Sequence, residues 1–428
     1  MLGWALLAET IPLYPLYALL FVEAGLSVAE ISALFVIWSA VGIVAEVPTG
    51  ALADRFSRRG ALVASGLMQA AGYAVWVLLP GFAGFAAGFV LWGLGSVLAS
   101  GAAEALLYDG LVAAGAREHY ARVQGRVTAV ELAAQLPAAA AAIVLVAGGG
   151  YALVGWASVG VCLAAATAAS RLPEARPGRG ANADDADGPL VDGRLGDRKP
   201  GDGTLGDVGP HRAGGAATGP DDGEPGYLAT LRAGLAEAAG RPPVRAVVVA
   251  AALLGGVDAI EEYDNLLAAG WGITVAHVPA WLLAISAAGA AGALLGGRAA
   301  RLPVAALTGL LGVGVAALTL AAVLACPVGI LAVAVFYGLY RAVLVVVDAR
   351  LQDGITGAVR ATVTSVAGVG VDLAGIALYA AWALGGLPLV LGLLVLLTAV
   401  LPLLLRARPD RPADELERDT GPTARAAP

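Results

Sequence analysis

The sequence predicts an all-α integral membrane protein with twelve transmembrane helices in two pseudo-symmetric six-helix bundles. Its composition, its long apolar runs and an internal repeat lead to this prediction. Of its 428 residues, 59% are hydrophobic and 14% are charged, and the mean hydropathy is +0.79, whereas soluble domains are roughly 25% charged. Runs such as GLPLVLGLLVLLTAVLPLLL could not all be buried in soluble cores.

The apolar runs define the spans. A hydrocarbon core about 30 Å thick needs roughly 20 helical residues, and runs of this size are separated by Gly, Pro or charge. The predicted spans are residues 2–23, 29–53, 60–79, 83–111, 123–147, 151–170, 244–268, 275–297, 303–324, 328–349, 360–383 and 386–405.

Arginine gives the orientation. It occurs in the turns after spans two, four, eight and ten, while the alternate turns carry neither Lys nor Arg. By the positive-inside rule, both termini and the middle loop face the cytoplasm, which predicts a multi-pass protein of the cytoplasmic (inner) membrane. The formal net charge of −7 arises mostly in the middle loop and the tails, and no basic domain for nucleic acid is present.

Composition also divides the chain. Residues 1–170 and 244–405 are predicted to form the two bundles. Residues 171–226, rich in Gly, Pro and Asp, are predicted to be a flexible cytoplasmic linker, since they have little apolar surface to bury. Residues 227–243 have helical spacing of apolar residues and are predicted to be an amphipathic cytoplasmic segment, and residues 406–428 a disordered cytoplasmic tail.

An internal repeat relates the halves. A shift of 247 residues places Gly25 on Gly272, Ser27 on Thr274 and Gly50 on Gly297. A slightly different offset places Asp109 on Asp348. Parallel repeats of this kind put the substrate site near the membrane midplane, between the halves.

The loop after span two carries a recognisable motif. EVPTGALADRFSRRGAL resembles the cytoplasmic motif of the major facilitator superfamily, Gly-x-Leu-Ala-Asp-Arg-x-Gly-Arg-Arg-x-x-Leu. Ser57 stands where glycine is usual, and SGAAEALLYDGL and YARVQGR further resemble the bacterial drug-efflux-like branch. The matching residues are Gly50, Leu52, Ala53, Asp54, Arg55, Arg58, Arg59 and Leu62.

The resemblance implies a gate. Asp54 is expected to cap or pair with the start of span eleven, where Arg360 is a nearby candidate partner, and so to favour the state closed to the cytoplasm. Asp109 and Asp348 are expected to accept hydrogen bonds that help to latch this face. The second loop, LLGGRAARLP, has Arg301 in place of the acid, so the halves are expected to latch unequally. The predicted gate residues are Gly50, Asp54, Arg55, Arg58, Arg59, Asp109, Asp348 and Arg360.

Ionisable residues inside the spans are functional candidates, because they are costly to place in a membrane. None lies in spans three, six, nine and twelve, which the resemblance implies are outer supports. Asp258, Glu261 and Glu262 of span seven are spaced i, i+3 and i+4, so on an α-helix at least two carboxylates share a face. Neighbouring buried carboxylates can hold a proton near neutral pH. The candidates for proton coupling are Asp258, Glu261, Glu104 and Glu46.

The predicted cavity residues leave alternatives open. Arg341 is either in a structural ion pair, a partner that releases an acid, or a ligand for an anionic substrate. Glu262 and Asp264 are either solvated residues at the mouth or part of the site, and the aromatic candidates could be packing residues. Span four lacks the arginine that many proton-coupled relatives carry. The substrate-cavity candidates are Glu9, Glu131, Arg341, Asp372, Tyr14, Tyr17, Trp38 and Glu262.

The sequence favours a carrier over an enzyme. It contains no Walker loop, nucleotide fingerprint, nucleophile elbow or metal-ligand spacing, so no cofactor or metal is expected. The favoured function is proton-coupled efflux (antiport) of a small organic compound by a monomer in the lipid bilayer. Proton-coupled uptake or facilitated diffusion is the alternative, and a non-transporting receptor or scaffold is the remote one.

Overall fold

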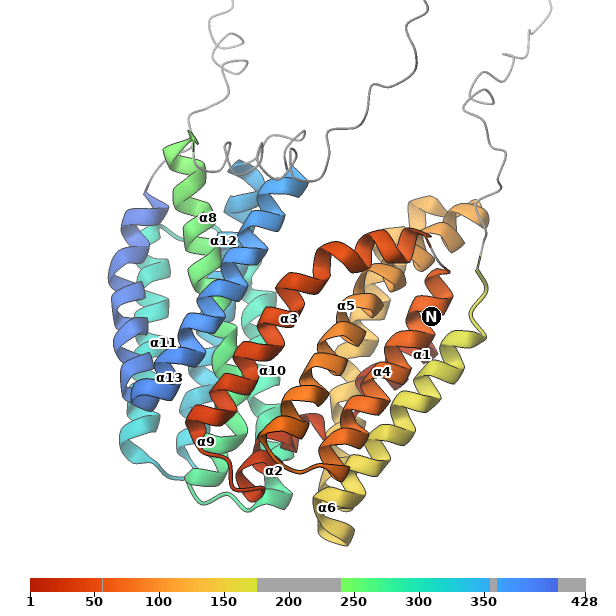
Figure 1. Ribbon diagram of the computed structural model, residues 1–428. Helices are drawn as coiled ribbons and strands as arrows, with labels where there is room; N and C mark the ends of the chain where they lie inside the picture. The colour runs from red at the N-terminus through yellow and green to blue at the C-terminus, as the bar shows by residue number, and fades with distance from the viewer. Residues whose placement is uncertain (56, 175–239, 355–359, 407–428) are drawn as a thin grey trace, which may run out of the picture.

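The structure is a computed structural model that describes residues 1–55, 57–174, 240–354 and 360–406. Within the helices it leaves out the side chains of residues 46–55, 121, 354 and 360–362. The predicted linker at 171–226, the amphipathic segment at 227–243 and the tail at 406–428 fall almost wholly outside these ranges. The described residues form helices joined by short turns (Figure 1).

Sixteen helical elements make up the described chain. In the N-terminal half they are α1 (Leu2–Glu9), η1 (Tyr14–Leu16), α2 (Tyr17–Glu23), α3 (Val28–Arg55), α4 (Arg58–Leu78), α5 (Phe82–Ala113), η2 (Arg117–His119) and α6 (Tyr120–Ser170). In the C-terminal half they are α8 (Pro242–Gly255), η4 (Gly256–Tyr263), α9 (Asp264–Gly270), η5 (Val275–His277), α10 (Val278–Ala299), α11 (Val304–Leu324), α12 (Gly329–Gly354) and α13 (Arg360–Leu405).

The twelve-crossing prediction is confirmed, although ten helical segments of the described chain are long and apolar enough to cross a membrane. Two of them turn back on themselves. The 51 residues of α6 would extend about 75 Å if straight, more than twice the hydrocarbon thickness. The chain reverses at Gly149 and Gly150 in α6 and at Gly386 in α13, where φ is 63° at Gly150 and 60° at Gly386, values that favour glycine. Each of these helices therefore supplies two crossings.

Spans one and seven are broken at matching places. Span one is α1, η1 and α2, and span seven is α8, η4 and α9. A shift of 247 residues places η4 on residues 9–16, which contain the break in span one. The prediction of a continuous α-helix over residues 244–268 is wrong for η4, which is a 3-10 helix of eight residues. Since such a helix has three residues per turn, Asp258 and Glu261 lie one above the other.

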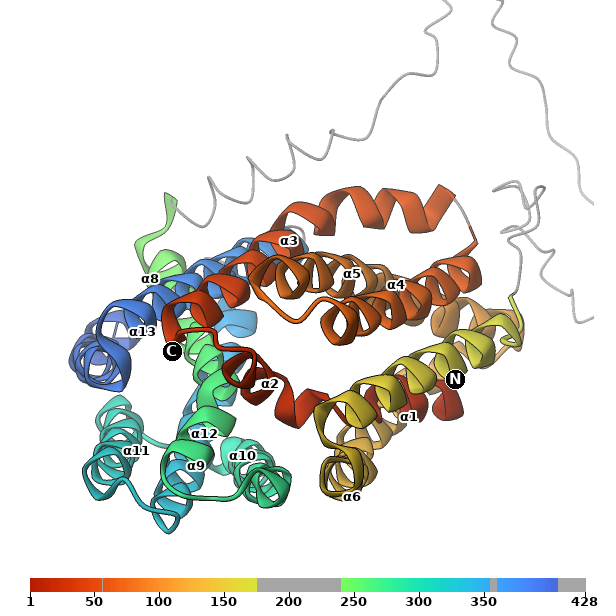
Figure 2. The same ribbon diagram turned by 60° about the horizontal axis from the view of Figure 1, so that its bottom comes forward.

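Among the residues that the structure describes, the two halves share a hydrophobic core at one end. One cluster of buried residues joins Phe35 of α3 to Tyr263 of η4 and extends through both halves. A second, around Trp4, Leu62 and Leu106, belongs to the N-terminal half alone. We call the end where α6 ends and α8 begins the linker end. Figures 1 and 2 show the halves meeting around α2 and α9 and diverging toward the linker end.

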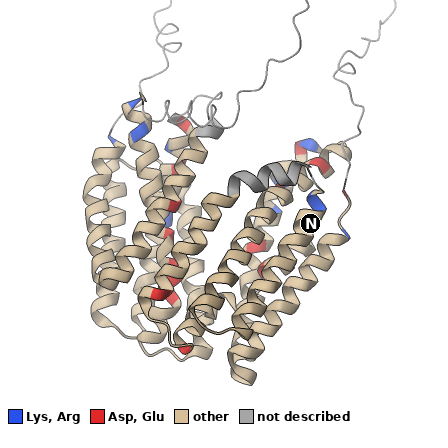
Figure 3. Cartoon of the chain, viewed as in Figure 1, with Lys and Arg blue, Asp and Glu red and all other residues tan. Residues whose placement is uncertain are grey.

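The charged residues are distributed differently at the linker end and inside the bundle. Figure 3 shows Lys and Arg gathered near the linker end and acidic residues inside the bundle. The linker end is the side that arginine placement predicts to be cytoplasmic.

Candidate functional site

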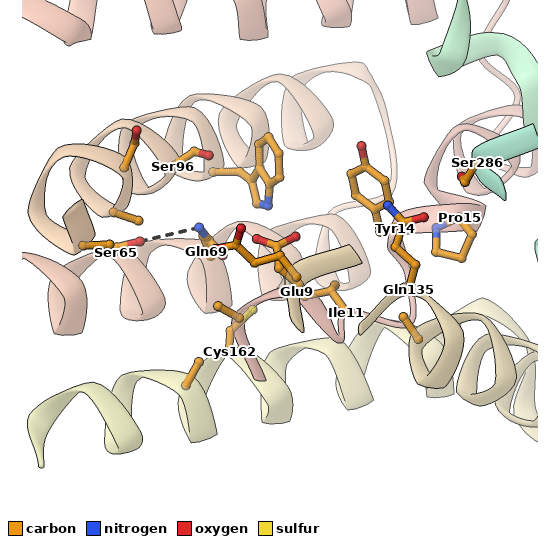
Figure 4. A pocket seen from close by; sticks show the side chains of 18 of the residues that line it. Glu9, Ile11, Tyr14, Pro15, Ser65, Gln69, Ser96, Gln135, Cys162 and Ser286 are labelled. Atoms are coloured by element: carbon orange, nitrogen blue, oxygen red, sulfur yellow. Dashed lines mark hydrogen bonds between the residues drawn. The ribbon is translucent and has the colours of Figure 1, made fainter. Parts of the chain in front are cut away.

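A cavity of about 520 Å³ lies between the two halves. Its walls come from α1, η1, α2, α4, α5 and α6 on one side and from η4, α9 and α10 on the other. Figure 4 shows part of the N-terminal wall, with the side chain of Gln69 beside that of Glu9 and the side chain of Gln135 beside Tyr14. The broken spans thus contribute a wall of the cavity in each half.

All the charged side chains among the described lining residues of the cavity are acids. No Lys or Arg side chain is among its described lining residues. Three of the acids come from the N-terminal half and three from the C-terminal half: Glu9, Glu104, Glu131, Glu261, Glu262 and Asp264. The structure therefore brings together acids that are spread over four spans of the sequence.

Neutral polar and aromatic groups complete the wall. Gln69 Nε2 donates to Ser65 Oγ at 3.5 Å (Figure 4). Tyr14 is 42% exposed and faces the cavity. The other amides and aromatics on the wall are Gln124, Gln135, Asn265, Trp4, Tyr17 and Trp92.

An ion pair stands beside the cavity. Arg341 Nη1 of α12 donates to Asp258 Oδ2 at 2.9 Å and to Oδ1 at 3.2 Å. The Tyr337 hydroxyl lies 2.8 Å from Glu261 Oε2 and 3.2 Å from Asp258 Oδ1, so it can donate to either carboxylate. Glu261 lines the cavity, whereas Asp258 and Arg341 do not. The single hydroxyl of Tyr337 thus connects the ion pair to the cavity wall.

Two acceptors on the wall have no partner in the described structure. Asp264 Oδ1 and Asn265 Oδ1 are buried without a hydrogen bond, and the residues are 1% and 4% exposed. Asp264 is therefore not a solvated residue at the mouth, which was one of its two interpretations. Buried polar atoms are nearly always paired, so two unpaired acceptors on adjacent residues call for an explanation.

The other predicted residues have different surroundings. Tyr17 lines the cavity but is 7% exposed and packs against Phe21 and Phe35. Trp38 packs against Trp92 with ring centroids 5.5 Å apart and is not on the wall. Asp372 is half-buried on α13, also away from the wall. The side chain of Glu46 lies outside the described residues.

The described part of the predicted gate forms contacts within the N-terminal half. Arg58 donates to Asp109 and to the carbonyl oxygen of Ala105, the latter at 3.1 Å. Asp348 is exposed on α12. The side chains of Asp54, Arg55 and Arg360, and the surroundings of Gly50, lie outside the described residues, so the expected contact between the halves stays a prediction.

Ser57, the departure from the family motif, joins the start of α4 to the end of α6. Its Oγ accepts from the backbone N–H of Gly60 at 2.9 Å as an N-cap and donates to Glu174 Oε2 at 2.7 Å. Burial acts to raise the pKa of Glu174. Hydrogen bonds from the Ser57 hydroxyl and from the backbone N–H groups of Arg59 and Arg58, with the charge of Arg59, outweigh this effect and hold the pKa below its ordinary value.

Acid should release this contact. A carboxyl whose pKa is depressed on folding stabilises the folded state fully above its unfolded pKa, about 4.3 for Glu. The stabilisation is lost as pH falls through the folded value. We expect amide hydrogen exchange at residues 57–62, corrected for intrinsic rates, to accelerate below about pH 4. Glu174→Gln should exchange faster at neutral pH and lose this acid step; an unchanged profile would contradict the assignment.

Sequence reasoning missed the amide groups on the wall and the importance of Asn265. One signal was available. Pro12 and Pro15 interrupt span one, and the pair Gly255 and Gly256 interrupts span seven. Interruptions at corresponding places in two halves are a pointer to the binding site of a transporter.

Comparison with known proteins agrees with the fold. The family model of the Major Facilitator Superfamily matches residues 1–379. No curated protein matches the sequence. A mutant form of the nucleoside transporter NupG is similar in structure, with a TM-score of 0.65 at 12% identity, over 95% of this chain and 96% of that one.

Two further solved structures are similar. A bacterial homolog to the human lysosomal transporter Spinster, in an inward-facing and occupied conformation, has a TM-score of 0.64 at 14% identity, over 95% of this chain and 90% of that one. A D-xylose-proton symporter has a TM-score of 0.62 at 13% identity, over 94% of this chain and 95% of that one. At these identities the likeness concerns the fold.

Proposed function

The chain belongs to the major facilitator superfamily, and on that premise we propose that it exports a small organic compound across the cytoplasmic membrane in exchange for protons. The observation that carries this proposal is the cavity between the halves, lined by acids from both. Acids in such a position are costly to keep unless they bind something. A scaffold that does not transport has no need of them.

The shape of the molecule supports alternating access. The halves share a core at the end of α2 and α9, while the buried clusters that the described residues form at the linker end belong to one half each. Rocking the halves about the cavity would open the first end and close the second. The described conformation is then the one in which the cavity faces the linker end, with both termini on the cytoplasmic side.

The ion pair beside the cavity supports proton coupling. Glu261 lies on the wall and can exchange a proton with water in the cavity, while Asp258 is held by Arg341. The Tyr337 hydroxyl connects the two carboxylates and so offers a route for a proton from Glu261 to Asp258. A proton that reached Asp258 would neutralise it and free the Arg341 guanidinium. Protons and substrate that compete for the same acids exclude each other, which favours exchange over symport. Glu104 also lies on the wall and is a further candidate for carrying the coupled proton.

A gradient assay tests the proposal. Purified protein in liposomes is given an acidic lumen, an alkaline lumen or no pH gradient, and a panel of labelled compounds is added outside. For antiport, one compound should accumulate in the acidic lumen, and accumulate less with Glu261→Gln. Protein-free liposomes control for weak bases that cross the lipid unaided.

The other outcomes select the alternatives. Accumulation in an alkaline lumen would indicate symport, the activity named for the similar D-xylose-proton symporter. Equilibration without a gradient would indicate facilitated diffusion. Movement of no compound in the panel would count against a transporter.

A further inference from the structure

The charge of the cavity restricts what it can bind. Its six acids are not balanced by any Lys or Arg side chain among the described lining residues. Arg341, which could have attracted an anion, donates to Asp258 and does not line the cavity. A cleft lined by one sign of charge concentrates ligands of the other sign. The cavity therefore favours a cation.

The unpartnered acceptors restrict the cation further. Asp264 Oδ1 and Asn265 Oδ1 are consecutive along the chain, buried and on the wall. An acceptor buried without a partner costs about 1–3 kcal/mol, which a donor from the ligand would recover. A quaternary ammonium or phosphonium ion has no such donor. A protonated amine, an amidinium or a guanidinium presents two or more N–H groups.

The aromatic side chains on the wall and the volume of the cavity indicate the size and character of the rest of the ligand. Tyr14 and Trp92 line the cavity from the N-terminal half, whereas Asp264 and Asn265 line it from the C-terminal half. Aromatic faces attract cations and stack on planar groups. A volume of about 520 Å³ lies within the range of sites for drug-sized molecules.

The geometry points to an organic cation with N–H donors on its positive group as the substrate, bound through that group by Asp264 and Asn265. The assignment of this ligand as cargo rests on the proposed function, while its binding does not. Neutral compounds would leave the acids without a counter-charge, and anions would be repelled.

Binding to the purified protein tests this inference. The protein is placed in nanodiscs of phosphatidylcholine, a lipid without net charge, and 4′,6-diamidino-2-phenylindole is titrated as a fluorescent amidinium probe, with empty nanodiscs as the blank. Benzamidinium, its neutral isostere benzamide, and tetraphenylphosphonium, a cation without N–H groups, are used as competitors. We expect benzamidinium to displace the probe at concentrations at which benzamide does not.

Two variants separate charge from hydrogen bonding. Asn265→Leu keeps the charge and removes an acceptor, so amidinium affinity should fall about tenfold and tetraphenylphosphonium affinity should stay the same. Asp264→Asn removes the charge, so amidinium affinity should fall roughly 10- to 100-fold and tetraphenylphosphonium affinity by less. Retained tetraphenylphosphonium binding shows that the variants fold. The matched control is Glu23→Gln, an exposed acid away from the wall, which should bind both cations normally.

Three results would overturn the inference: no amidinium binding, competition by benzamide equal to that by benzamidinium, or the same response of both cations to Asn265→Leu. Its failure is distinguishable from failure of the proposed function. Cations that bind but do not move with a proton gradient would refute antiport alone. Gradient-driven transport of a neutral compound, without amidinium binding, would refute the cation assignment alone.

Discussion

Replacing Arg341 with glutamine is expected to abolish gradient-driven transport in a protein that still folds. Its guanidinium lies 2.9 Å from Asp258 Oδ2, and Asp258 and Glu261 both lie within hydrogen-bond reach of the Tyr337 hydroxyl. Without Arg341, the Asp258 carboxylate would lose its counter-charge and would repel that of Glu261. With no guanidinium to bind and release, a proton arriving at these acids would no longer change the contacts in the site, so it could not drive transport.

The cost in stability should be modest. Breaking a fully buried ion pair costs about 3–5 kcal/mol. Here the Arg341 and Asp258 side chains are 36% and 40% exposed, so water screens part of the interaction. We expect a loss of about 1–2 kcal/mol, within reach of a thermal-shift measurement in detergent.

The double variant Asp258→Asn with Arg341→Gln is the control. It removes both charges, so it should recover most of the lost stability and allow equilibration of substrate without accumulation. Lys in place of Arg341 keeps the charge but not the paired geometry, and should retain partial activity. Full gradient-driven transport by Arg341→Gln would remove the ion pair from the mechanism.

Replacing Tyr263 with alanine is expected to open the end of the molecule that the structure shows closed. Tyr263 is fully buried and stacks on Trp382, with ring centroids 3.9 Å apart. It also packs edge-on against Phe35 of the other half at 5.4 Å, and its hydroxyl shares a 2.7 Å hydrogen bond with Ser32. Removal of a buried aromatic side chain costs about 3–5 kcal/mol. Under the proposed rocking of the halves, the contacts of Tyr263 with Phe35 and Ser32 exist in one state of the cycle, so the cost falls mainly on that state.

Labelling of a cysteine in the cavity measures the change. Ser286→Cys places a thiol on the wall, in a background with Cys162→Ala and Cys326→Ala. An impermeant maleimide should label the parent protein from the linker end only, in vesicles of defined orientation. With Tyr263→Ala it should label from the opposite end as well, and transport should fall.

A milder variant controls for loss of folding. Tyr263→Phe keeps the ring and removes only the hydrogen bond to Ser32, which costs about 1 kcal/mol. It should show an intermediate labelling pattern. Labelling of Tyr263→Ala from the linker end alone would show that these contacts do not close the opposite end.

Local sequence patterns were sufficient to predict the membrane spans, because whether a segment can span the membrane depends on the residues of that segment. A run of about 20 apolar residues in lipid must be helical, since no water is present to form hydrogen bonds with the backbone N–H and C=O groups. Gly149 falls within a predicted turn, and Gly386 is the residue that directly follows another, at the predicted start of the last span; the structure reverses at both places. The repeat and the motif around Asp54 indicated the two halves and the family. Glu9, Glu131 and Glu261 were marked as functional candidates because charge inside a span is costly.

Pattern reasoning failed where the backbone departs from an α-helix. The spacing of Asp258, Glu261 and Glu262 was interpreted with 3.6 residues per turn, whereas η4 has three. Asn265 has no net charge, so the cost of placing charge in a membrane does not single it out. Its importance depends on what surrounds it, which includes residues far away in sequence.

The sequence by itself determined the crossings, the repeat, the family and the acids inside the spans. Hydropathy and the free-energy cost of placing charge in a membrane depend on each residue and its neighbours in sequence. Only the tertiary structure decided that Arg341 pairs with Asp258 away from the wall, that six acids from four spans meet in one cavity, and that Asp264 Oδ1 and Asn265 Oδ1 have no hydrogen-bond partner among the described residues. These facts depend on distances between segments that are far apart in the chain, as Asp258 and Arg341 are at a separation of 83 positions. Hydrogen bonding and Coulomb interactions act over a few ångströms, so only the folded chain decides which groups they join.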